Sequence, residues 1–157
     1  MISTLCTLYD EDFVAVVRAR HPFAARPTLE RFCQAKHLVV SMTGDAHGFV
    51  DQALAKQGLA RRVAVTVPDF VMGLATVAET DLIATMPRRF VAMHAARFDV
   101  MPREVPLRLR SFAIRAAVPK VALMDTGLAW LYDVLREAVE GERAPRQKGR
   151  TRVRASS

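Results

Sequence analysis

Three short apolar runs each end at a turn that is followed by a helical pattern, and this repeated arrangement constrains the fold more than any other feature. The runs span 37–41, 63–67 and 81–85, and the turns after them are Met42-Thr43-Gly44-Asp45, Pro68-Asp69 and Met86-Pro87. Strands that alternate with helices favour a parallel sheet. Open parallel sheets bind ligands at the carboxyl ends of their strands. The sequence therefore indicates where a site lies before it indicates what the site binds.

A helix is expected after each run, at about 48–57, 70–79 and 88–97, because apolar residues there recur at helical spacing. The expected inward positions are Phe49, Ala53 and Leu54 in the first helix, Val71, Leu74, Val77 and Ala78 in the second, and Phe90, Val91 and His94 in the third. Gly58 suits the end of the first helix, because glycine adopts the left-handed conformation without strain.

The flanks of this central part supply fewer elements. A strand is expected over 12–20, ended by His21-Pro22 because proline donates no hydrogen bond, and Thr28 is expected to cap a short helix. Farther along, 100–109 is interrupted by proline, 111–118 indicates another strand, and 126–139 indicates a helix ended by Gly141. The middle, about 25–100, forms a self-consistent βαβαβα lobe. The flanks are too small to close a second core of their own.

Composition is typical of a soluble globular domain, with 51% hydrophobic and 25% charged residues among 157. No apolar run approaches the roughly 20 residues that span a bilayer. Residues 1–10 lack the basic start and long apolar stretch of a signal peptide, so a cytoplasmic location without a membrane partner is expected. Cys6 and Cys33 form no disulfide framework and no metal-binding spacing.

Most of the net charge of +7 belongs to the end of the chain. Residues 142–157 hold six cations and one anion, which gives +5 and leaves +2 for residues 1–141. Segment 142–157 also has almost nothing to bury and is expected to be disordered. A basic tail can contact nucleic acid electrostatically, but a solvated chain end is the favoured interpretation.

Several segments in this order resemble the effector-binding domain of LysR-type transcriptional regulators. The resemblance rests on EDFVAVVRARHPFA (11–24), on the ordered run HLVVS, GFVDQALAKQGLARRVAVTVPDF and TDLIATMP between 37 and 87, and on WLYDVLREAV (130–139). No single short motif is diagnostic, but the combination is specific. The match covers about residues 9–139 and is similar to the branch with nodulation and aromatic-degradation regulators.

The resemblance implies an α/β, Rossmann-like, two-lobed fold of the periplasmic-binding-protein type II, with one lobe complete and the other partial. It divides the chain into a partial lobe one at 1–24, a complete lobe two at 25–105, a return to lobe one at 106–141, and the basic tail. It implies a small-molecule effector between the lobes and a homo-oligomer. The family's winged helix-turn-helix is absent from the sequence, so the chain is expected to be a truncated regulator that meets DNA only through a domain it does not contain.

Eight residues at the strand ends are the candidate effector contacts: Ser41, Thr43, Gly44, Val67, Pro68, Asp69, Phe70 and Thr85. Hydroxyl and amide groups at a helix start can hold a carboxylate, and Phe70 can stack against a ring. The structural alternatives are that Thr43 or Asp45 caps a helix, that Asp69 is an N-cap with Phe70 in the core, and that Thr85 bonds to main chain. Of the histidines, only His47 lies near this turn.

No catalytic constellation, cofactor motif or metal spacing is present, so neither an enzyme nor a cofactor or metal site is predicted. Asp51, Glu79 and Asp81 are interpreted as scattered surface charges and not as an acid–base pair. The predicted function is effector sensing for a transcriptional regulator. The alternative is a small-molecule-binding α/β protein without a regulatory role.

Overall fold

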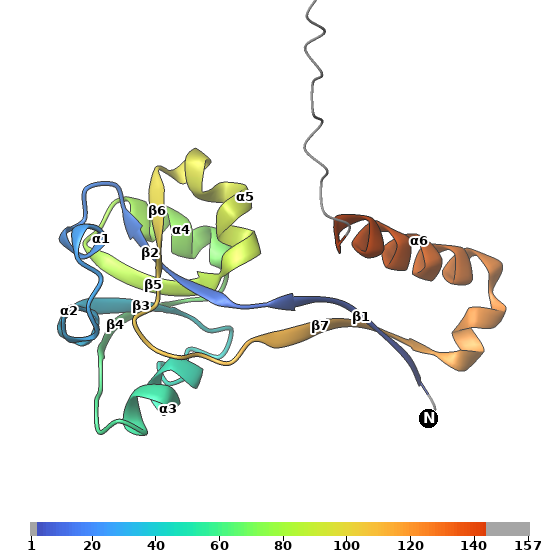
Figure 1. The fold of residues 1–157 in the computed structure, drawn as a ribbon, viewed down its shortest axis with the longest axis horizontal. Helices are drawn as coiled ribbons and strands as arrows, with labels where there is room; N and C mark the ends of the chain where they lie inside the picture. The colour runs from blue at the N-terminus through green and yellow to red at the C-terminus, as the bar shows by residue number, and fades with distance from the viewer. Residues whose placement is uncertain (1–2, 144–157) are drawn as a thin grey trace, which may run out of the picture. The chain divides into compact units, whose positions relative to one another are not determined.

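The computed structural model describes residues 3–143 of the chain. Two compact units are present among the described residues: a larger one, Glu11–Phe112, and a smaller one formed by residues 3–10 and 113–143. Their elements follow one another along the chain as coloured in Figure 1. Residues 144–157, most of the expected disordered tail, lie outside the described part.

The larger unit is built on a five-stranded mixed sheet of order β4-β3-β5-β2-β6. The strands, in that order, are Arg62–Val67, Lys36–Val40, Leu82–Pro87, Phe13–Arg18 and Val100–Glu104. Strand β3 pairs in parallel with β4 and β5, which confirms the parallel arrangement expected from the three apolar runs. Strand β2 is antiparallel to both β5 and β6. The sheet is therefore parallel at one side, among β4, β3 and β5, and antiparallel at the other, among β5, β2 and β6.

Helices cover both faces of this sheet. On one face lie α4 (Phe70–Ala78) and α5 (Arg88–Phe98); on the other lie α1 (Pro22–Ala25), α2 (Leu29–Gln34) and α3 (Phe49–Ala55). Buried residues of β2 alternate between the two hydrophobic clusters, as a strand with two covered faces requires. Val14 and Val16 join the cluster with Leu74, Val77 and Val91, and Ala15 and Val17 join the one with Phe32, Val50 and Leu54.

Local capping chemistry agrees with the sequence. Thr28 Oγ1 accepts from the Arg31 N–H at 3.4 Å, and Asp69 Oδ1 accepts from the Met72 N–H at 2.8 Å. Each oxygen satisfies one of the N–H groups that a helix leaves unpaired at its start. Gly58, with φ 68°, donates its N–H to the Ala55 carbonyl just after α3, as expected for its left-handed conformation.

Two expected core residues are exposed. Phe49 and Val71 were placed inward by helical spacing, but their side chains are 44% and 52% exposed. In α3 the buried residues are Val50 and Leu54, and in α4 they are Gly73, Leu74 and Val77. The buried stripe is rotated from the expected one because spacing alone leaves the phase of a short helix undetermined.

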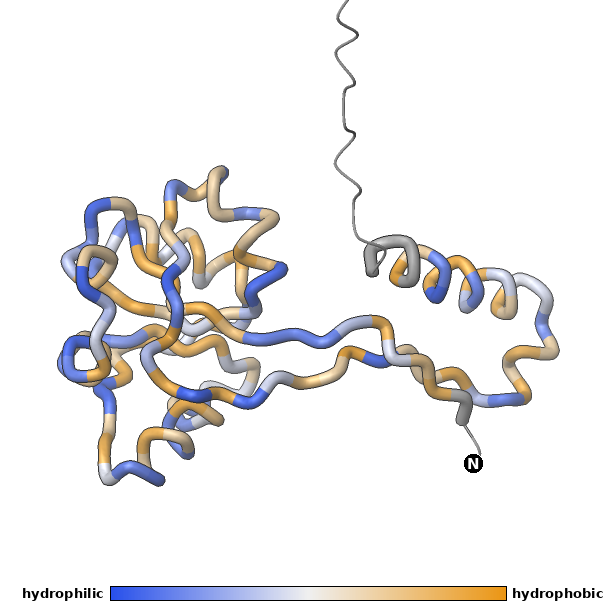
Figure 2. The backbone as a smooth tube through the Cα atoms, viewed as in Figure 1, coloured by the Kyte–Doolittle hydropathy of each residue, from blue (hydrophilic) through white to orange (hydrophobic). Residues whose placement is uncertain are grey.

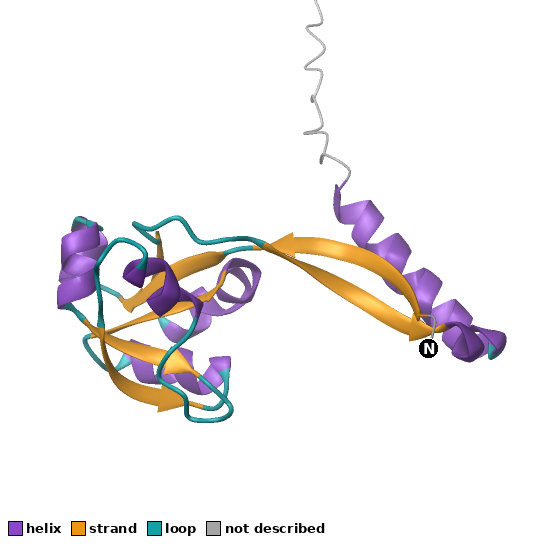
Figure 3. Cartoon of the chain, turned by 90° about the horizontal axis from the view of Figure 1, so that it is seen from below, coloured by secondary structure: helices purple, strands orange, loops and turns teal. Residues whose placement is uncertain are grey.

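The smaller unit contains a two-stranded sheet of β1 (Ser3–Glu11) and β7 (Phe112–Pro119), then η1 (Lys120–Met124) and α6 (Thr126–Arg143). Figure 3 shows the arrowheads of β1 and β7 at opposite ends of the pair. Strand β1 and η1 were not predicted, and α6 continues to Arg143 instead of ending at Gly141. Figure 2 shows apolar and polar residues alternating around α6, and Leu128, Trp130 and Leu131 are each at least 46% exposed.

The compact units divide the chain after Asp10 and after Phe112, and not after residues 24 and 105. The reason is that β2 and β6 pair along Val14–Arg18, so both strands belong to the sheet of the larger unit. Arg88 holds the same region together, because its guanidinium donates to both carboxylate oxygens of Asp12 (2.7 and 3.1 Å) and of Glu104 (2.7 and 2.8 Å). The assignment of these units to lobes of a larger domain stays a prediction.

Gly73 allows α4 to pack closely on the sheet. A Cβ at this position would lie 2.6 Å from Met86 Cε and 3.3 Å from Val40 Cγ2. We expect Gly73→Ala to lower the free energy of unfolding by about 1 kcal/mol. The Met86 methyl group that must move is fully buried, and Val40 Cγ2 is also in tight contact, so overpacking costs more than the helix propensity that alanine gains. Urea unfolding measures the change. Gly48→Ala is the control, since its Cβ would meet nothing within 4 Å; equal or greater stability of Gly73→Ala would refute the packing argument.

Candidate functional site

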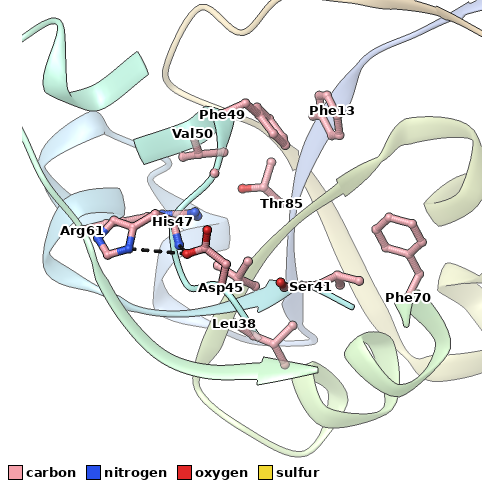
Figure 4. Close-up of a pocket in the computed structure, with 13 residues that line it drawn as sticks. Phe13, Leu38, Ser41, Asp45, His47, Phe49, Val50, Arg61, Phe70 and Thr85 are labelled. Carbon is pink, nitrogen blue, oxygen red and sulfur yellow. Dashed lines mark hydrogen bonds and ion pairs between the residues drawn. The ribbon is translucent and has the colours of Figure 1, made fainter. Parts of the chain in front are cut away.

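A pocket of about 150 Å³ lies at the carboxyl ends of β3 and β5, where the topology places ligand sites in such sheets. Figure 4 shows the lining side chains converging from both sides of the sheet edge. Ser41 follows β3, Thr85 is on β5, Phe49 begins α3, and Phe70 begins α4. Phe13 joins them because β2 is antiparallel, so its first residue lies at the edge where β5 ends, paired with Pro87.

Three of the eight candidate contacts line this pocket: Ser41, Phe70 and Thr85. Thr43 lies next to them, since its Oγ1 is 3.3 Å from Ser41 Oγ. Gly44 has φ 78° and forms the turn after β3. The structure thus brings together the residues at the ends of β3 and β5. Effector contact by these residues remains a prediction.

The loop after β4 is less involved than expected. The Val67 side chain is buried in the core, its carbonyl accepts from the Ser41 N–H at 2.8 Å, and neither Pro68 nor Asp69 lines the pocket. The Asp69 carboxylate is occupied as the N-cap of α4. Phe70 combines both alternatives, because it packs against the core and also faces the pocket.

Two aromatic residues of the pocket, Phe13 and Phe49, were missed as site residues. Their ring centroids are 4.2 Å apart, and together with Phe70 they give the pocket three apolar walls. Such rings can contact a ring of a ligand. The place of Phe49 at the start of the helix that follows the first strand end was the one signal available in the sequence, but its helical spacing indicated an inward position instead.

A nearly buried ion pair closes the pocket beside α3. Arg61 donates from Nε and Nη2 to the two carboxylate oxygens of Asp51, at 2.9 and 2.8 Å, and Asp51 also accepts from the Gly48 N–H at 2.8 Å. Partial burial raises the pKa of Asp51, but the hydrogen bonds from Arg61 and Gly48 outweigh it and leave the pKa below its usual range. Asp51 is therefore not the surface charge that was expected. Because the pair is neutral overall, Arg61 offers this pocket little net positive charge.

Thr85 carries an unpaired hydroxyl. Its Oγ1 is buried and has no hydrogen-bond partner among the described residues. The expected bond to main chain is therefore absent there. An unpaired buried polar group costs roughly 1–3 kcal/mol, so a ligand atom that bonds to Oγ1 would recover stability that the free protein lacks.

The histidines of this region differ in environment. His47 is exposed, with Nδ1 3.8 Å from Asp45 Oδ1, and it lines the pocket. His37 is fully buried in β3; its Nε2 lies 2.6 Å from the Phe32 carbonyl oxygen, so Nε2 carries the proton and donates. Within residues 3–143, no three His, Cys, Asp or Glu side chains gather as metal ligands would.

Comparison with known proteins identifies the family. The model of the LysR substrate binding domain matches residues 6–140. The chain belongs to the LysR substrate binding domain family. It is 31% identical over 131 residues to the HTH-type transcriptional activator NagR of Ralstonia sp, a match that covers 83% of this chain and 44% of NagR. The chain thus spans less than half the length of this LysR relative.

Solved LysR-type regulatory domains share the fold. The regulatory domain of MexT, a transcriptional activator in Pseudomonas aeruginosa, is similar with a TM-score of 0.73 and 28% identity, over 86% of this chain and 65% of that one. The effector binding domain of QuiR, solved in complex with shikimate, has a TM-score of 0.70 over 88% of this chain and 66% of its own. At 16% identity, QuiR supports the fold alone. The periplasmic-binding-protein type of α/β fold implied by the sequence is confirmed.

NagR and MexT are both transcriptional activators. For the described residues, no helix is both long and apolar enough to cross a membrane.

His37 gives the domain a defined pH dependence. Burial lowers its pKa from 6.5 to about 4, helped by the charge of Arg61 and opposed by the hydrogen bond to Phe32. The folded state therefore resists protonation that the unfolded state accepts. The contribution to stability is complete above pH 6.5 and is lost as the pH falls toward about 4, at up to about 1.4 kcal/mol per pH unit.

Urea unfolding between pH 7.5 and 4 measures this slope. His37→Gln keeps a donor for the Phe32 carbonyl but removes the titrating group. The free energy of unfolding of this variant should therefore fall less steeply with decreasing pH, by the equivalent of nearly one bound proton. Equal slopes in the two proteins would show that His37 does not cause the pH dependence.

Proposed function

We propose that this chain is the effector-sensing part of a LysR-type transcriptional regulator, and that the pocket at the ends of β3 and β5 holds a small molecule. The family match supports the regulatory role. The observation that carries the site is the buried, unpaired Thr85 hydroxyl beside the rings of Phe13, Phe49 and Phe70. A pocket with apolar walls and one unpaired polar atom suits a ligand that makes apolar contacts with the rings and a hydrogen bond to that atom.

The dimensions and charges of the pocket support a narrow class of effector. A volume of about 150 Å³ suits one small ring, since a cavity of roughly 150 Å³ accommodates benzene. Hydroxyls of Ser41, Thr43 and Thr85 suit a hydrogen-bonding substituent on that ring. Because Asp51 neutralises Arg61 and Asp45 is exposed nearby, an uncharged polar substituent is favoured over a carboxylate. QuiR, whose effector binding domain was solved in complex with shikimate, offers a precedent for a ring-shaped effector in this fold.

The effector would act by changing the packing of the elements that line the pocket. They include Phe13 at the start of β2 and Phe49 at the start of α3, so a ligand between them joins distant parts of the chain. A ligand shifts the equilibrium between two arrangements of a protein according to the difference in its affinity for them. In a complete regulator of the family, we expect a homo-oligomer in the cytoplasm that meets DNA through a DNA-binding domain outside this sequence.

Ligand binding tests the site with a one-ring panel: phenol, benzamide and benzoate, measured by calorimetry. We expect a phenol or amide to bind and Phe70→Ala to weaken binding about tenfold through loss of its apolar wall. Val71→Ala is the matched control, since this neighbour on α4 is exposed and does not line the pocket. Failure of every panel member to bind, or equal weakening by both variants, would contradict the proposal.

Thr85→Val gives a second test in which two effects have opposite signs. Valine has nearly the same shape but no hydroxyl. The free energy of unfolding of the variant should therefore be higher than that of the wild type by about 1 kcal/mol, because a buried unpaired group is removed. The same change should weaken binding of the ligand that bonds to Oγ1. Thermal unfolding with and without ligand measures both effects; a variant that is both less stable and equally able to bind would rule out the proposed role of the hydroxyl.

A further inference from the structure

A second, larger cavity lies in the same unit, between α3 and the connection from β6 to β7. Its volume is about 650 Å³, within the range of small-molecule sites. Figure 1 shows this connection passing beside α3 before it enters β7. One side is lined by Gln52 and Ala53 of α3 and by Lys56 and Gln57 directly after it. The other side is lined by residues 108–112. No residue of 40–47 takes part, so this cavity is distinct from the pocket at the strand ends.

The cavity is strongly cationic. Lys56, Arg108 and Arg110 line it, and no Asp or Glu does. Within residues 3–143, these three side chains have no carboxylate partner and no hydrogen bond. Three like charges around one opening repel one another, and an anion bound among them relieves that repulsion. The strand-end pocket differs, because its one cation, Arg61, is paired with Asp51.

The inner wall of the cavity is aromatic. Phe13 lies between two other rings, with centroids 4.2 Å from Phe49 and 5.3 Å from Phe112. Phe49 and Phe112 are 44% and 39% exposed, so their rings have faces or edges available to a ligand. Exposed aromatic surface gains free energy when a planar apolar group covers it. The cavity thus combines an aromatic wall with a cationic rim.

We propose that this cavity is a second small-molecule site, specific for a planar aromatic carboxylate of about two fused rings. The ring system would cover Phe49 and Phe112, and the carboxylate would meet the guanidinium groups of Arg108 and Arg110, which bind carboxylates through paired N–H donors. Phe13 and Phe49 also line the strand-end pocket. Occupancy of one site therefore changes the packing of rings that the other site uses, which couples the two ligands.

The test uses the whole chain and 2-naphthoate, with 2-naphthamide as the uncharged analogue. Calorimetry should give saturable binding of the acid and at least about fivefold weaker binding of the amide. The variant Arg108→Gln/Arg110→Gln should weaken 2-naphthoate binding about tenfold, because charge-assisted hydrogen bonds are lost. The matched control, Arg26→Gln/Arg62→Gln, removes the same charge from exposed positions that do not line the cavity.

Amide shifts in two-dimensional NMR locate the ligand. We expect 2-naphthoate to move the signals of Ala53, Gln57, Leu109 and Ser111, and Val71→Ala, which changes a residue that lines neither cavity, to change its affinity less than twofold. Equal loss in the control variant would show a general effect of net charge. No saturable binding, equal binding of the amide, or shifts centred on Ser41 and Thr85 would each overturn the second site. Because Phe70 and Thr85 are tested separately with one-ring ligands, failure here leaves the strand-end proposal standing.

Discussion

The burial of β2 between β5 and β6 is the constraint on which the larger unit depends. Its four central residues, Val14–Val17, are at most 1% exposed, and they alternate between the two hydrophobic clusters. A strand with both faces and both edges covered cannot shift register without unpacking each cluster. The same burial fixes Phe13 at the edge of the sheet where β5 ends, beside the strand-end pocket. Arg88 reinforces the arrangement by joining Asp12, before β2, to Glu104, at the end of β6.

The two cavities share rings but differ in electrostatics, and this difference separates their proposed ligands. At the strand ends, the Arg61–Asp51 pair leaves a nearly neutral pocket whose distinctive feature is an unpaired hydroxyl. Between α3 and segment 108–112, unpaired cations surround an aromatic wall. Aromatic surface supplies affinity in both places, whereas the polar groups decide which substituent is accepted. Phe13 and Phe49 line both cavities, and the proposed coupling between the two ligands rests on these shared rings.

Much of the fold could be predicted because its signals are local. The runs at 37–41, 63–67 and 81–85 became parallel strands, and Thr28 and Asp69 became caps, since alternation, helical period and cap chemistry act over a few residues. The site could be predicted only in part. Ser41, Phe70 and Thr85 were found from the rule about strand ends, but Phe13 was missed because its place depends on the antiparallel pairing of β2. Asp51 was misjudged because its partner, Arg61, is ten residues away, in the loop just before β4.

The sequence by itself determined the alternation of strands and helices, the family, and the sheet edge at which a ligand should bind, because all of these are written in residue order and period. Only the tertiary structure decided which strand lies at the centre, which carboxylate neutralises Arg61, and which cations remain unpaired. Those outcomes depend on distances between residues far apart in the chain. Such distances are set by how two hydrophobic clusters pack against opposite faces of one sheet, and no local pattern encodes them.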